Sequence, residues 1–313
     1  MFSNINMNKF HIKGVVQLSL AKFEVFSTVV ELGSLTKAGE ALGLSQSAVS
    51  HAITSLESEW GFSILNRGRS GVQLTSNGER ILTYVREMLK WNEDMVQEIA
   101  NINGLEIGTV RIGTFSSVSI HWLPEMMKIF HEHHPSIEIE LLEGDYDDIE
   151  RWISTGAVDF GFVSLPTSPY FEVIPLKKDQ MLCILPDNHP LADQKEVSFD
   201  MIKDEPFIKS KKGSDNDLAR ILKENKVTPN VRFELIDDHA IISMVENGMG
   251  ISILPEMILH WVPDNVRKLT LEGENYRTIG IAATSFKTLA PATKKFIDYL
   301  KSWLSESSDL DTV

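Results

Sequence analysis

Apolar residues between positions 45 and 61 recur with a helical period. Val49, Ile53, Leu56 and Trp60 lie four, three and four positions apart, which places them on one face of an α-helix. We expect this face to be buried in a core. The opposite face carries short side chains that can form hydrogen bonds, and it should point outward: Gln46, Ser47, Ser50, His51 and Thr54.

A second short helix is predicted directly before this one. Ser34 and Ser45 can cap the two helices, because a serine hydroxyl accepts a hydrogen bond from an unpaired N–H at a helix N-terminus. Gly43 lies between the helices and provides the bend. The pattern predicts a helix-turn-helix. Taken alone, such a pair is more often an ordinary amphipathic surface element than a DNA reader.

The segment after Gly61 favours DNA binding. Two apolar residues are followed by Arg67, Gly68, Arg69, Ser70 and Gly71, and a short strand is then predicted over residues 72–74. A basic, glycine-rich hairpin directly after a helix-turn-helix is typical of a wing, whose arginines contact phosphates or a minor groove. The sequence therefore predicts a winged helix-turn-helix. A further helix, capped by Ser19, should pack beneath it.

These segments resemble the LysR-type bacterial transcriptional regulators. The motifs are Ser34-Leu35-Thr36-Lys37-Ala38, Leu44-Ser45-Gln46-Ser47-Ala48-Val49-Ser50, Leu56-Glu57, Gly61, Arg67, Arg69 and Leu74-Thr75-Ser76-Asn77-Gly78. One departure is Gly39, where this motif more often has alanine, at a cost of about 1 kcal/mol in helix propensity. The expected DNA-binding residues are Ser34, Thr36, Lys37, Ser45, Gln46, Ser47, Ser50, His51, Thr54, Arg67 and Arg69.

A long helix is predicted over residues 76–105. Ser76 and Glu79 have the spacing of a capping box. An apolar stripe with one polar member follows a heptad pattern, which favours pairing of two helices, and a buried asparagine can fix their register. The alternative is a linker helix packed on its own domain. In the resembled family this helix pairs two subunits. The stripe consists of Ile81, Val85, Met88, Asn92, Met95, Ile99 and Ile102.

Strand and helix patterns alternate in the rest of the chain, which predicts α/β architecture with parallel strands. Strands are expected over residues 109–113, 137–142, 160–163, 181–185, 207–208, 231–235, 251–254 and 279–283. Helices are expected over residues 122–134, 149–155, 218–225, 239–246 and 293–304. The resemblance implies two lobes, with the last strand and helix belonging to the first of them, as in periplasmic solute-binding proteins.

The expected fold class is thus a multidomain α+β chain with a winged helix, a linker helix and a bilobed α/β effector domain. The predicted boundaries are an N-terminal extension (1–18), the winged helix (19–75), the linker helix (76–105), the effector domain (106–305) and an acidic tail (306–313). Within the effector domain, lobe I covers about 106–178 and 277–305, and lobe II about 179–276.

Ligands of open α/β sheets bind beyond the carboxyl ends of strands, where helix N-termini offer free N–H groups. Residues at such positions are candidate effector contacts, although each could simply be a helix cap. Lys209 would suit an acidic effector, while Asp145 and Asp238 argue against assuming one. The candidates are Thr114, Phe115, Ser116, Ser117, Asp145, Tyr146, Ser164, Lys209, Ser210, Asp238 and His239.

Net charge and cysteine content narrow the interpretation. The 313-residue chain carries a net charge of −14, which argues against a protein that coats nucleic acid with a uniformly basic surface. Up to Thr75, six basic side chains stand against five acidic ones, so DNA affinity should depend on dimerisation and two half-sites. The single cysteine, Cys183, cannot form an internal disulfide, and a reducing cytoplasm is expected. We expect no membrane span.

Other constellations favour neither a metal site nor catalysis. His131, His133 and His134 cluster before Pro135, but no cysteine lies nearby, and an ordinary helix end explains them better. Residues 248–250 follow a helix and do not match a dinucleotide fingerprint. No nucleophile elbow is present, so we expect neither an enzyme nor a cofactor beyond an unidentified small-molecule effector.

Two hypotheses follow from these patterns. The first is an effector-controlled regulator that binds double-stranded DNA as a homo-oligomer. Tetramers are usual in the resembled family, and contact with RNA polymerase stays open. The second is a small-molecule binding protein whose N-terminal helices serve only oligomerisation.

Overall fold

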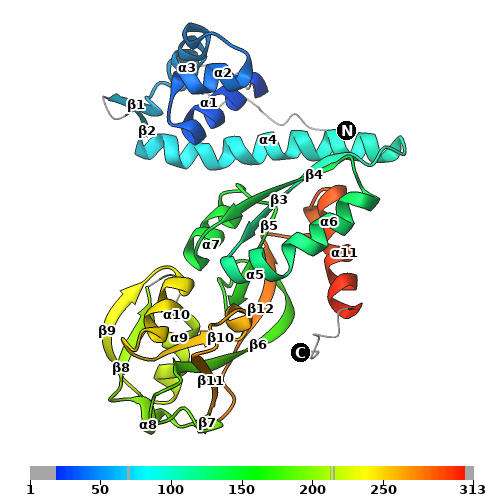
Figure 1. Cartoon of the computed structure of the whole chain (residues 1–313). Helices are drawn as coiled ribbons and strands as arrows, with labels where there is room; N and C mark the ends of the chain where they lie inside the picture. Colours follow the sequence, from blue (N-terminus) through cyan, green and yellow to red (C-terminus); the bar gives the residue numbers. More distant parts are fainter. Residues whose placement is uncertain (1–18, 69–70, 212, 214–215, 307–313) are drawn as a thin grey trace, which may run out of the picture. The chain divides into compact units, whose positions relative to one another are not determined.

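The structure is a computed structural model that describes residues 19–68, 71–211, 213 and 216–306, except for the Arg67 side chain. The predicted N-terminal extension and all but the first residue of the predicted acidic tail lie outside these residues. The chain divides into two compact units, Met1–Val96 and Gln97–Val313 (Figure 1). Among the described residues, no helix has the length and apolarity needed to span a bilayer.

The first unit is a winged helix-turn-helix, as the sequence predicts. Its apolar core includes Phe23, Phe26, Val49, Ile53 and Leu56, each no more than 2% exposed. This core joins the helices to the wing. The elements are α1 (Leu20–Leu32), α2 (Leu35–Leu42), α3 (Gln46–Trp60), β1 (Leu65–Gly68), β2 (Gly71–Leu74) and the first part of α4 (Ser76–Ile102).

The helix caps are largely those expected. The backbone N–H of Lys37 donates to Ser34 Oγ at 3.3 Å, and that of Ala48 donates to Ser45 Oγ at 3.2 Å. Gly43 ends α2 in the left-handed region, with φ of 66°. The prediction for Ser19 is wrong, because its side chain makes no cap hydrogen bond. Its carbonyl oxygen instead accepts from the N–H of Phe23.

The start of α4 differs from the predicted capping box. Ser76 is already the first helical residue, so the cap falls on Thr75. Thr75 Oγ1 accepts from the N–H of Gly78 at 3.0 Å and donates to the Ser63 carbonyl oxygen at 2.8 Å. The prediction of a capping box formed by Ser76 and Glu79 is therefore wrong. The cap also ties α4 to the segment that leads into the wing.

The predicted apolar stripe on α4 is divided between two faces. Val85 is 2% exposed and Ile81 is half-buried, and both pack in the core of the winged helix. The prediction that Ile81 and Val85 belong to the pairing stripe is therefore wrong. Asn92 is half-buried. Four members of the predicted stripe stay exposed on α4, namely Met88, Met95, Ile99 and Ile102, together with Tyr84, Trp91 and Val96.

The second unit is built around one long mixed sheet and a two-stranded parallel sheet. The long sheet has the strand order β4-β3-β5-β12-β6-β11-β7, with β10 also paired to β6, and β8 pairs with β9. β3 is parallel to β4 and β5, as the alternating pattern predicts. β12 is antiparallel to both β5 and β6, so the returning strand closes the first lobe.

These strands and helices alternate through most of the second unit. The strands are β3 (Gly108–Thr114), β4 (Ile137–Glu143), β5 (Phe160–Leu165), β6 (Glu172–Pro186), β7 (Glu196–Val197), β8 (Pro206–Ser210), β9 (Asn230–Leu235), β10 (Ser252–Pro255), β11 (Val266–Leu271) and β12 (Tyr276–Ala283). The helices are α5 (Ser116–His121), α6 (Leu123–His133), α7 (Tyr146–Ser154), α8 (Phe199–Ile202), α9 (Asn216–Glu224), α10 (Asp238–Glu246), η1 (Ile258–His260), η2 (Phe286–Thr288) and α11 (Pro291–Glu306).

Helices cover both faces of the sheet in lobe I. Phe160 of β5 packs against Phe296 of α11, with ring centroids 6.1 Å apart. Gly161 faces the opposite side, where a Cβ atom would lie 2.5 Å from the Ile149 side chain of α7. The alternation of large and absent side chains along β5 therefore places α11 on one face and brings α7 close on the other.

Lobe II has its own apolar cores, formed by residues between 181 and 271. Strand β6 contributes to two of them, because successive side chains point to opposite faces. Cys183 lies in the core shared with α8 and α9, and Ile184 in the core shared with α10. A strand buried on both faces appears in the sequence as a continuous apolar run, which is what residues 181–185 show.

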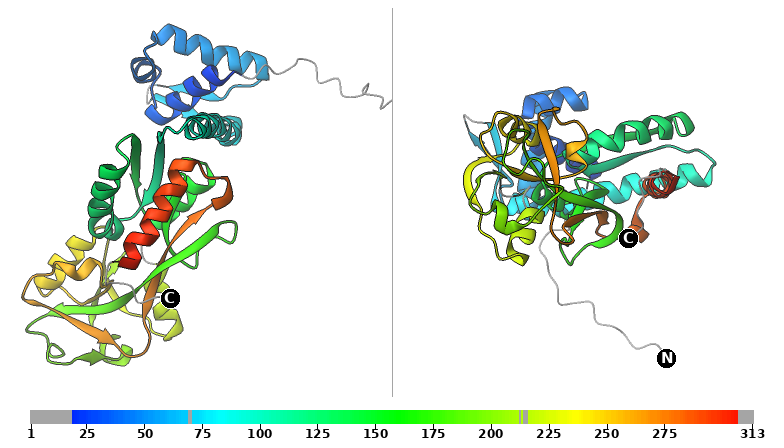
Figure 2. Two further views of the ribbon diagram at one scale, coloured as in Figure 1. Left: turned by 90° about the vertical axis from the view of Figure 1, so that its right-hand side faces the viewer. Right: turned by 60° about the horizontal axis from the view of Figure 1, so that its bottom comes forward.

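Two long strands connect the lobes. β6 and β12 run side by side through the second unit, paired from Tyr276↔Gln180 to Ala283↔Glu172 (Figure 2). β6 therefore begins nine residues before the predicted start at Met181, because its first half is amphipathic rather than uniformly apolar. The paired strands give the expected two crossings between lobes.

Candidate nucleic-acid interface and effector cavity

The outward face of α3 is polar, as expected for a recognition helix. Gln46, Ser47, His51 and Thr54 are exposed, and Ser50 is half-buried. On α2, Thr36 and Lys37 are also exposed, whereas Ser34 is half-buried at the cap. Ser45 Oγ lies 2.9 Å from Ser47 Oγ and caps the helix. Ser34 and Ser45 thus have structural roles in addition to their predicted contacts with DNA.

Glu57 positions the wing. Its Oε1 accepts hydrogen bonds from the backbone N–H groups of Ile64, at 2.9 Å, and Leu65, at 3.3 Å. β1 then pairs with β2, with Arg67 opposite Val72. The backbone therefore places Arg67 within the wing strand. Arg69, the second predicted wing contact, lies outside the described residues.

Gly39 explains the close approach of α2 and the following turn. A Cβ atom on this glycine would lie 2.7 Å from the carbonyl oxygen of Leu44. That oxygen belongs to the backbone and cannot move as easily as a side chain. In this chain, glycine at position 39 therefore allows α2 to lie against the turn that precedes α3.

A cavity of about 70 Å³ lies in the second unit. Both lobes contribute to its walls, with Asp145 and Tyr146 from lobe I and Asp217 and Asp238 from lobe II. One side is apolar. The lining residues are Phe115, Ser116, Ser117, Gly144, Asp145, Tyr146, Met181, Ser210, Asp217, Leu218, Ile236, Asp238, Ile253, Leu254, Pro255, Ile258 and Arg277.

Arg277 is the buried centre of this cavity. It is 3% exposed, and its Nε and Nη2 contact Asp179 Oδ2 at 2.8 and 2.7 Å. Nη2 also donates to Ser117 Oγ at 2.7 Å, and Nη1 donates to Tyr146 Oη at 3.1 Å. Burial alone would lower the pKa of Arg277, but Tyr146, Asp179 and Asp217 outweigh it and raise the pKa above its ordinary value. The guanidinium therefore stays charged.

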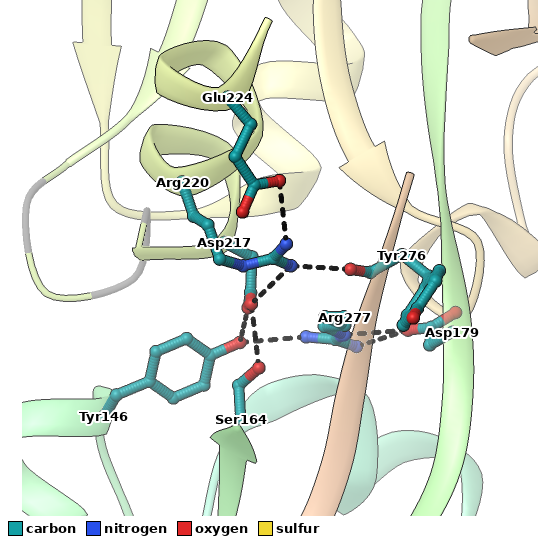
Figure 3. Close-up of polar contacts among 8 residues, drawn as sticks. All are labelled: Tyr146, Ser164, Asp179, Asp217, Arg220, Glu224, Tyr276 and Arg277. Carbon is teal, nitrogen blue, oxygen red and sulfur yellow. Dashed lines mark hydrogen bonds and ion pairs between the residues drawn. The ribbon is translucent and has the colours of Figure 1, made fainter. Parts of the chain in front are cut away.

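Asp217 accepts hydrogen bonds from two lobe I side chains (Figure 3). Tyr146 Oη donates to its Oδ2 at 3.3 Å, and Ser164 Oγ donates to its Oδ1 at 2.9 Å. Arg220 lies 3.7 Å away and also donates to the carbonyl oxygen of Tyr276. Burial raises the pKa of Asp217 in spite of these partners, and burial raises the pKa of Tyr146 to about 12.

The cavity brings together seven of the predicted effector contacts: Phe115, Ser116, Ser117, Asp145, Tyr146, Ser210 and Asp238. Four others do not line it. Thr114 is fully buried beside Ser119, and Ser164 is turned toward Asp217. Lys209 is half-buried and His239 is exposed, both outside the lining. Side chains that alternate along a strand explain why Ser210 faces the cavity and Lys209 does not.

Comparison with known proteins assigns both units. Residues 20–79 match the family described as "Bacterial regulatory helix-turn-helix protein, lysR family". Residues 103–305 match the LysR substrate binding domain. The chain belongs to the LysR family.

Relatives of this LysR-family regulator match along most of its length. The uncharacterized HTH-type transcriptional regulator YvbU of Bacillus subtilis is 35% identical, covering 91% of this chain and 98% of that protein. The probable HTH-type transcriptional regulator LrrA of Synechococcus elongatus is 30% identical, and the match covers 91% of this chain and 97% of that protein. The protein is therefore a DNA-binding transcriptional regulator with a substrate-binding domain, and effector binding is typical of its family. The family consists of regulators rather than enzymes.

Solved structures share the fold at low sequence identity. A variant of full-length OxyR from Pseudomonas aeruginosa superposes with a TM-score of 0.75 at 21% identity, covering 94% of this chain and 96% of that one. Full-length CbnR complexed with its target DNA gives a TM-score of 0.65 at 17% identity, and the match covers 91% of this chain and 99% of that one. These likenesses support the winged helix, linker helix and bilobed domain predicted from the sequence.

The sequence reasoning missed Arg277 and Asp217 in this regulator. Arg277 lies within β12, and not directly after a strand, where the candidate effector contacts were sought. Asp217 lies in the first turn of α9 rather than directly after a strand. A single charged residue within an otherwise apolar β-strand, as Arg277 is before Ile279 and Ile281, was the one available signal.

Other predicted constellations have structural explanations in the regulator. Among the described residues, no group of three His, Cys, Asp or Glu side chains is placed to hold a metal ion. His133 Nδ1 contacts the Ile129 carbonyl oxygen, and His134 Nδ1 contacts Glu106 at 2.8 Å. Cys183 is fully buried, which raises the pKa of its thiol to about 12. The thiol therefore stays protonated and unreactive at neutral pH.

Proposed function

We propose that this regulator reads its operator with the first turns of α3. Gln46 and His51 are exposed, and the amide of Gln46 can pair bidentately with adenine in a major groove. Ser47 and Thr54 are exposed on the same helix and suit bases or phosphates. The single observation that carries this proposal is the polar, exposed face of α3 opposite a face formed by buried Val49, Ile53 and Leu56.

The wing supplies phosphate contacts in this proposal. Glu57 fixes the start of β1, and the β1–β2 pairing positions Arg67 along the hairpin. Arg69 follows Arg67 by two positions in the sequence. Since the N-terminal region carries few cations, each one should contribute visibly to the salt dependence of binding. Two subunits are then needed for a specific site.

The exposed apolar stripe on α4 would pair two copies of the chain. Trp91 is 59% exposed and Met95 is 55% exposed. Apolar side chains at such spacings gain stability by packing against a second helix. We expect a homodimer at least, in which a ligand that closes the cavity shifts the spacing of the two DNA-binding units. RNA polymerase is the further partner through which such a shift would alter transcription.

Binding to DNA fragments flanking the gene of this regulator tests the proposal. Fluorescence anisotropy with competitor DNA should show tight, salt-sensitive binding by the full-length protein. Gln46→Ala should change sequence preference, while Arg67→Ala should weaken binding to all sequences and reduce the salt slope by about one. Ser58→Ala, at an exposed position in the last turn of the same helix, is the matched control and should change neither. Equal affinity for operator and random DNA would contradict the proposal.

A further inference from the structure

The cavity of the second unit carries more negative than positive charge. Asp145, Asp217 and Asp238 line it, whereas Arg277 is the only lining cation among the described residues. Its guanidinium is already balanced by Asp179, which does not line the cavity. Asp217 is paired with Arg220, 3.7 Å away, so the charge presented to a ligand comes from Asp145 and Asp238. This inference rests on the proposed role of the cavity as the effector site.

Arg277 is poorly placed to receive an anionic ligand. Its Nε and Nη2 contact Asp179, Nη2 also donates to Ser117, and Nη1 donates to Tyr146. A ligand carboxylate would have to displace Asp179, which is 3% exposed. A displaced Asp179 would be a buried carboxylate without its counter-ion, which is strongly unfavourable.

The carboxylates of Asp145 and Asp238 retain hydrogen-bond acceptor capacity. Asp145 uses Oδ1 to cap α7, where it accepts from the N–H of Asp148 at 2.8 Å. Asp238 accepts a hydrogen bond from Ser210. Each carboxylate oxygen can accept two hydrogen bonds, so both side chains retain acceptor capacity after these contacts.

The same cavity has apolar lining residues. Leu254, Pro255 and Ile258 line the cavity from lobe II, together with Met181. A short alkyl chain can bury its surface against these residues, while its charged end reaches the carboxylates. The cavity of about 70 Å³ limits the ligand to a small molecule.

We propose that the effector is a small organic cation, an ammonium group on a short alkyl chain, whose charge is held by Asp238 and Asp145. The ammonium donates to carboxylate oxygens of both lobes, and the alkyl part packs on Leu254 and Pro255. Because Asp145 belongs to lobe I and Asp238 to lobe II, one cation can hold the lobes together. Lys209, the residue that would suit an acidic effector, does not line this cavity.

Four-carbon probes with a positive, a negative or an uncharged end group test this proposal. n-Butylammonium, n-butyrate and 1-butanol are compared at equal concentration by ligand-observed NMR with the full-length protein. We expect n-butylammonium to bind at least about tenfold more tightly than n-butyrate, a difference of about 1.4 kcal/mol. Equal or tighter binding of n-butyrate, or no binding of n-butylammonium, would overturn the proposal.

Two neighbouring aspartates provide a matched pair of variants. Asp238→Asn removes a lining charge and should abolish the preference for the cation. Asp237→Asn removes a charge that lies outside the lining, and asparagine can still cap α10, so this control should keep the preference. Loss of the preference in both variants, or in neither, would contradict the assignment.

Operator binding by the same preparation separates this inference from the proposed function. If n-butylammonium binds but no DNA sequence is preferred, the regulator mechanism fails and the ligand class stands. If operator binding is specific but n-butylammonium does not bind, only the ligand class fails.

Discussion

Tyr146 Oη donates a hydrogen bond to Asp217 Oδ2 at 3.3 Å and accepts one from Arg277 Nη1 at 3.1 Å. Tyr146 begins α7 in lobe I, and Asp217 lies in the first turn of α9 in lobe II. A second contact runs beside it, from the backbone N–H of Tyr146 to the Gly213 carbonyl oxygen at 3.2 Å. The lobes are thus joined at one residue by both side chain and backbone.

Tyr146→Phe tests the side-chain part of this junction. The change removes one hydroxyl and leaves Asp217 and Arg277 each with one hydrogen bond fewer, so the free energy of unfolding should fall by about 1–3 kcal/mol. Urea denaturation measures the loss. Tyr170→Phe is the control, because Tyr170 is 87% exposed and its hydroxyl is not needed by a buried group. Equal stability of both variants would show that the junction contributes little.

Asp217 should make stability depend on pH. Burial raises the pKa of Asp217 in the folded state, so the folded protein binds more protons than the unfolded chain over the titration range. Its contribution is therefore fully present below the ordinary pKa of 3.8 and is lost as pH rises through the folded-state pKa. Thermal unfolding should show wild-type stability falling relative to Asp217→Asn as pH rises from this point. A difference that is constant with pH would contradict the assignment.

Arg277 and Asp179 should behave as a buried ion pair. Arg277→Met leaves Asp179 buried without its counter-ion, and unfolding free energy should fall by about 3–5 kcal/mol. The double variant Arg277→Met with Asp179→Leu should recover most of this loss, because neither charge then remains. Breaking the exposed pair of Arg151 and Asp148 by Arg151→Met should cost less than about 1 kcal/mol. A double variant no more stable than Arg277→Met would exclude this explanation.

Gly78→Ala should destabilise the winged helix. A Cβ atom at Gly78 would lie 2.1 Å from the Ile64 carbonyl oxygen and 3.0 Å from the Leu74 side chain. Overpacking of this kind costs about 1–3 kcal/mol, more than the gain of about 1 kcal/mol in helix propensity. Circular dichroism during thermal unfolding measures the net effect. Asn77→Ala, exposed in the same turn, is the control and should stay within about 0.5 kcal/mol of the parent chain.

The stripe on α4 should control assembly. Trp91→Lys places a charge where an apolar contact with a second copy is proposed. Dimers of this variant should therefore dissociate at a higher protein concentration than dimers of the parent chain. Light scattering coupled to size-exclusion chromatography reports the mass. Asn101→Lys introduces the same charge at an exposed position in the last turn of the helix and should leave the mass unchanged. An unchanged mass for Trp91→Lys would exclude Trp91 from the interface.

Short-range patterns in the amino-acid sequence predicted the helices, most strands and the family. Val49, Ile53 and Leu56 face one side of α3 because a helix repeats every 3.6 residues, so a local pattern fixes which face is buried. Ser34 and Ser45 cap their helices through contacts only three residues away. Such short-range relationships can be deduced without knowing the rest of the fold.

Long-range packing determined which residues of α4 are buried and which residues meet in the cavity. Val85 has the same apolar character as Met88, but packing of α4 on its own unit buries only the first of them. The cavity joins Ser117 to Arg277 across 160 positions, and Tyr146 to Asp217 across 71. No local pattern records such pairings, because they arise from contacts between distant elements, such as the return of β12 between β5 and β6, which carries Arg277. The charge of the cavity is therefore a property of the folded chain and not of any one segment.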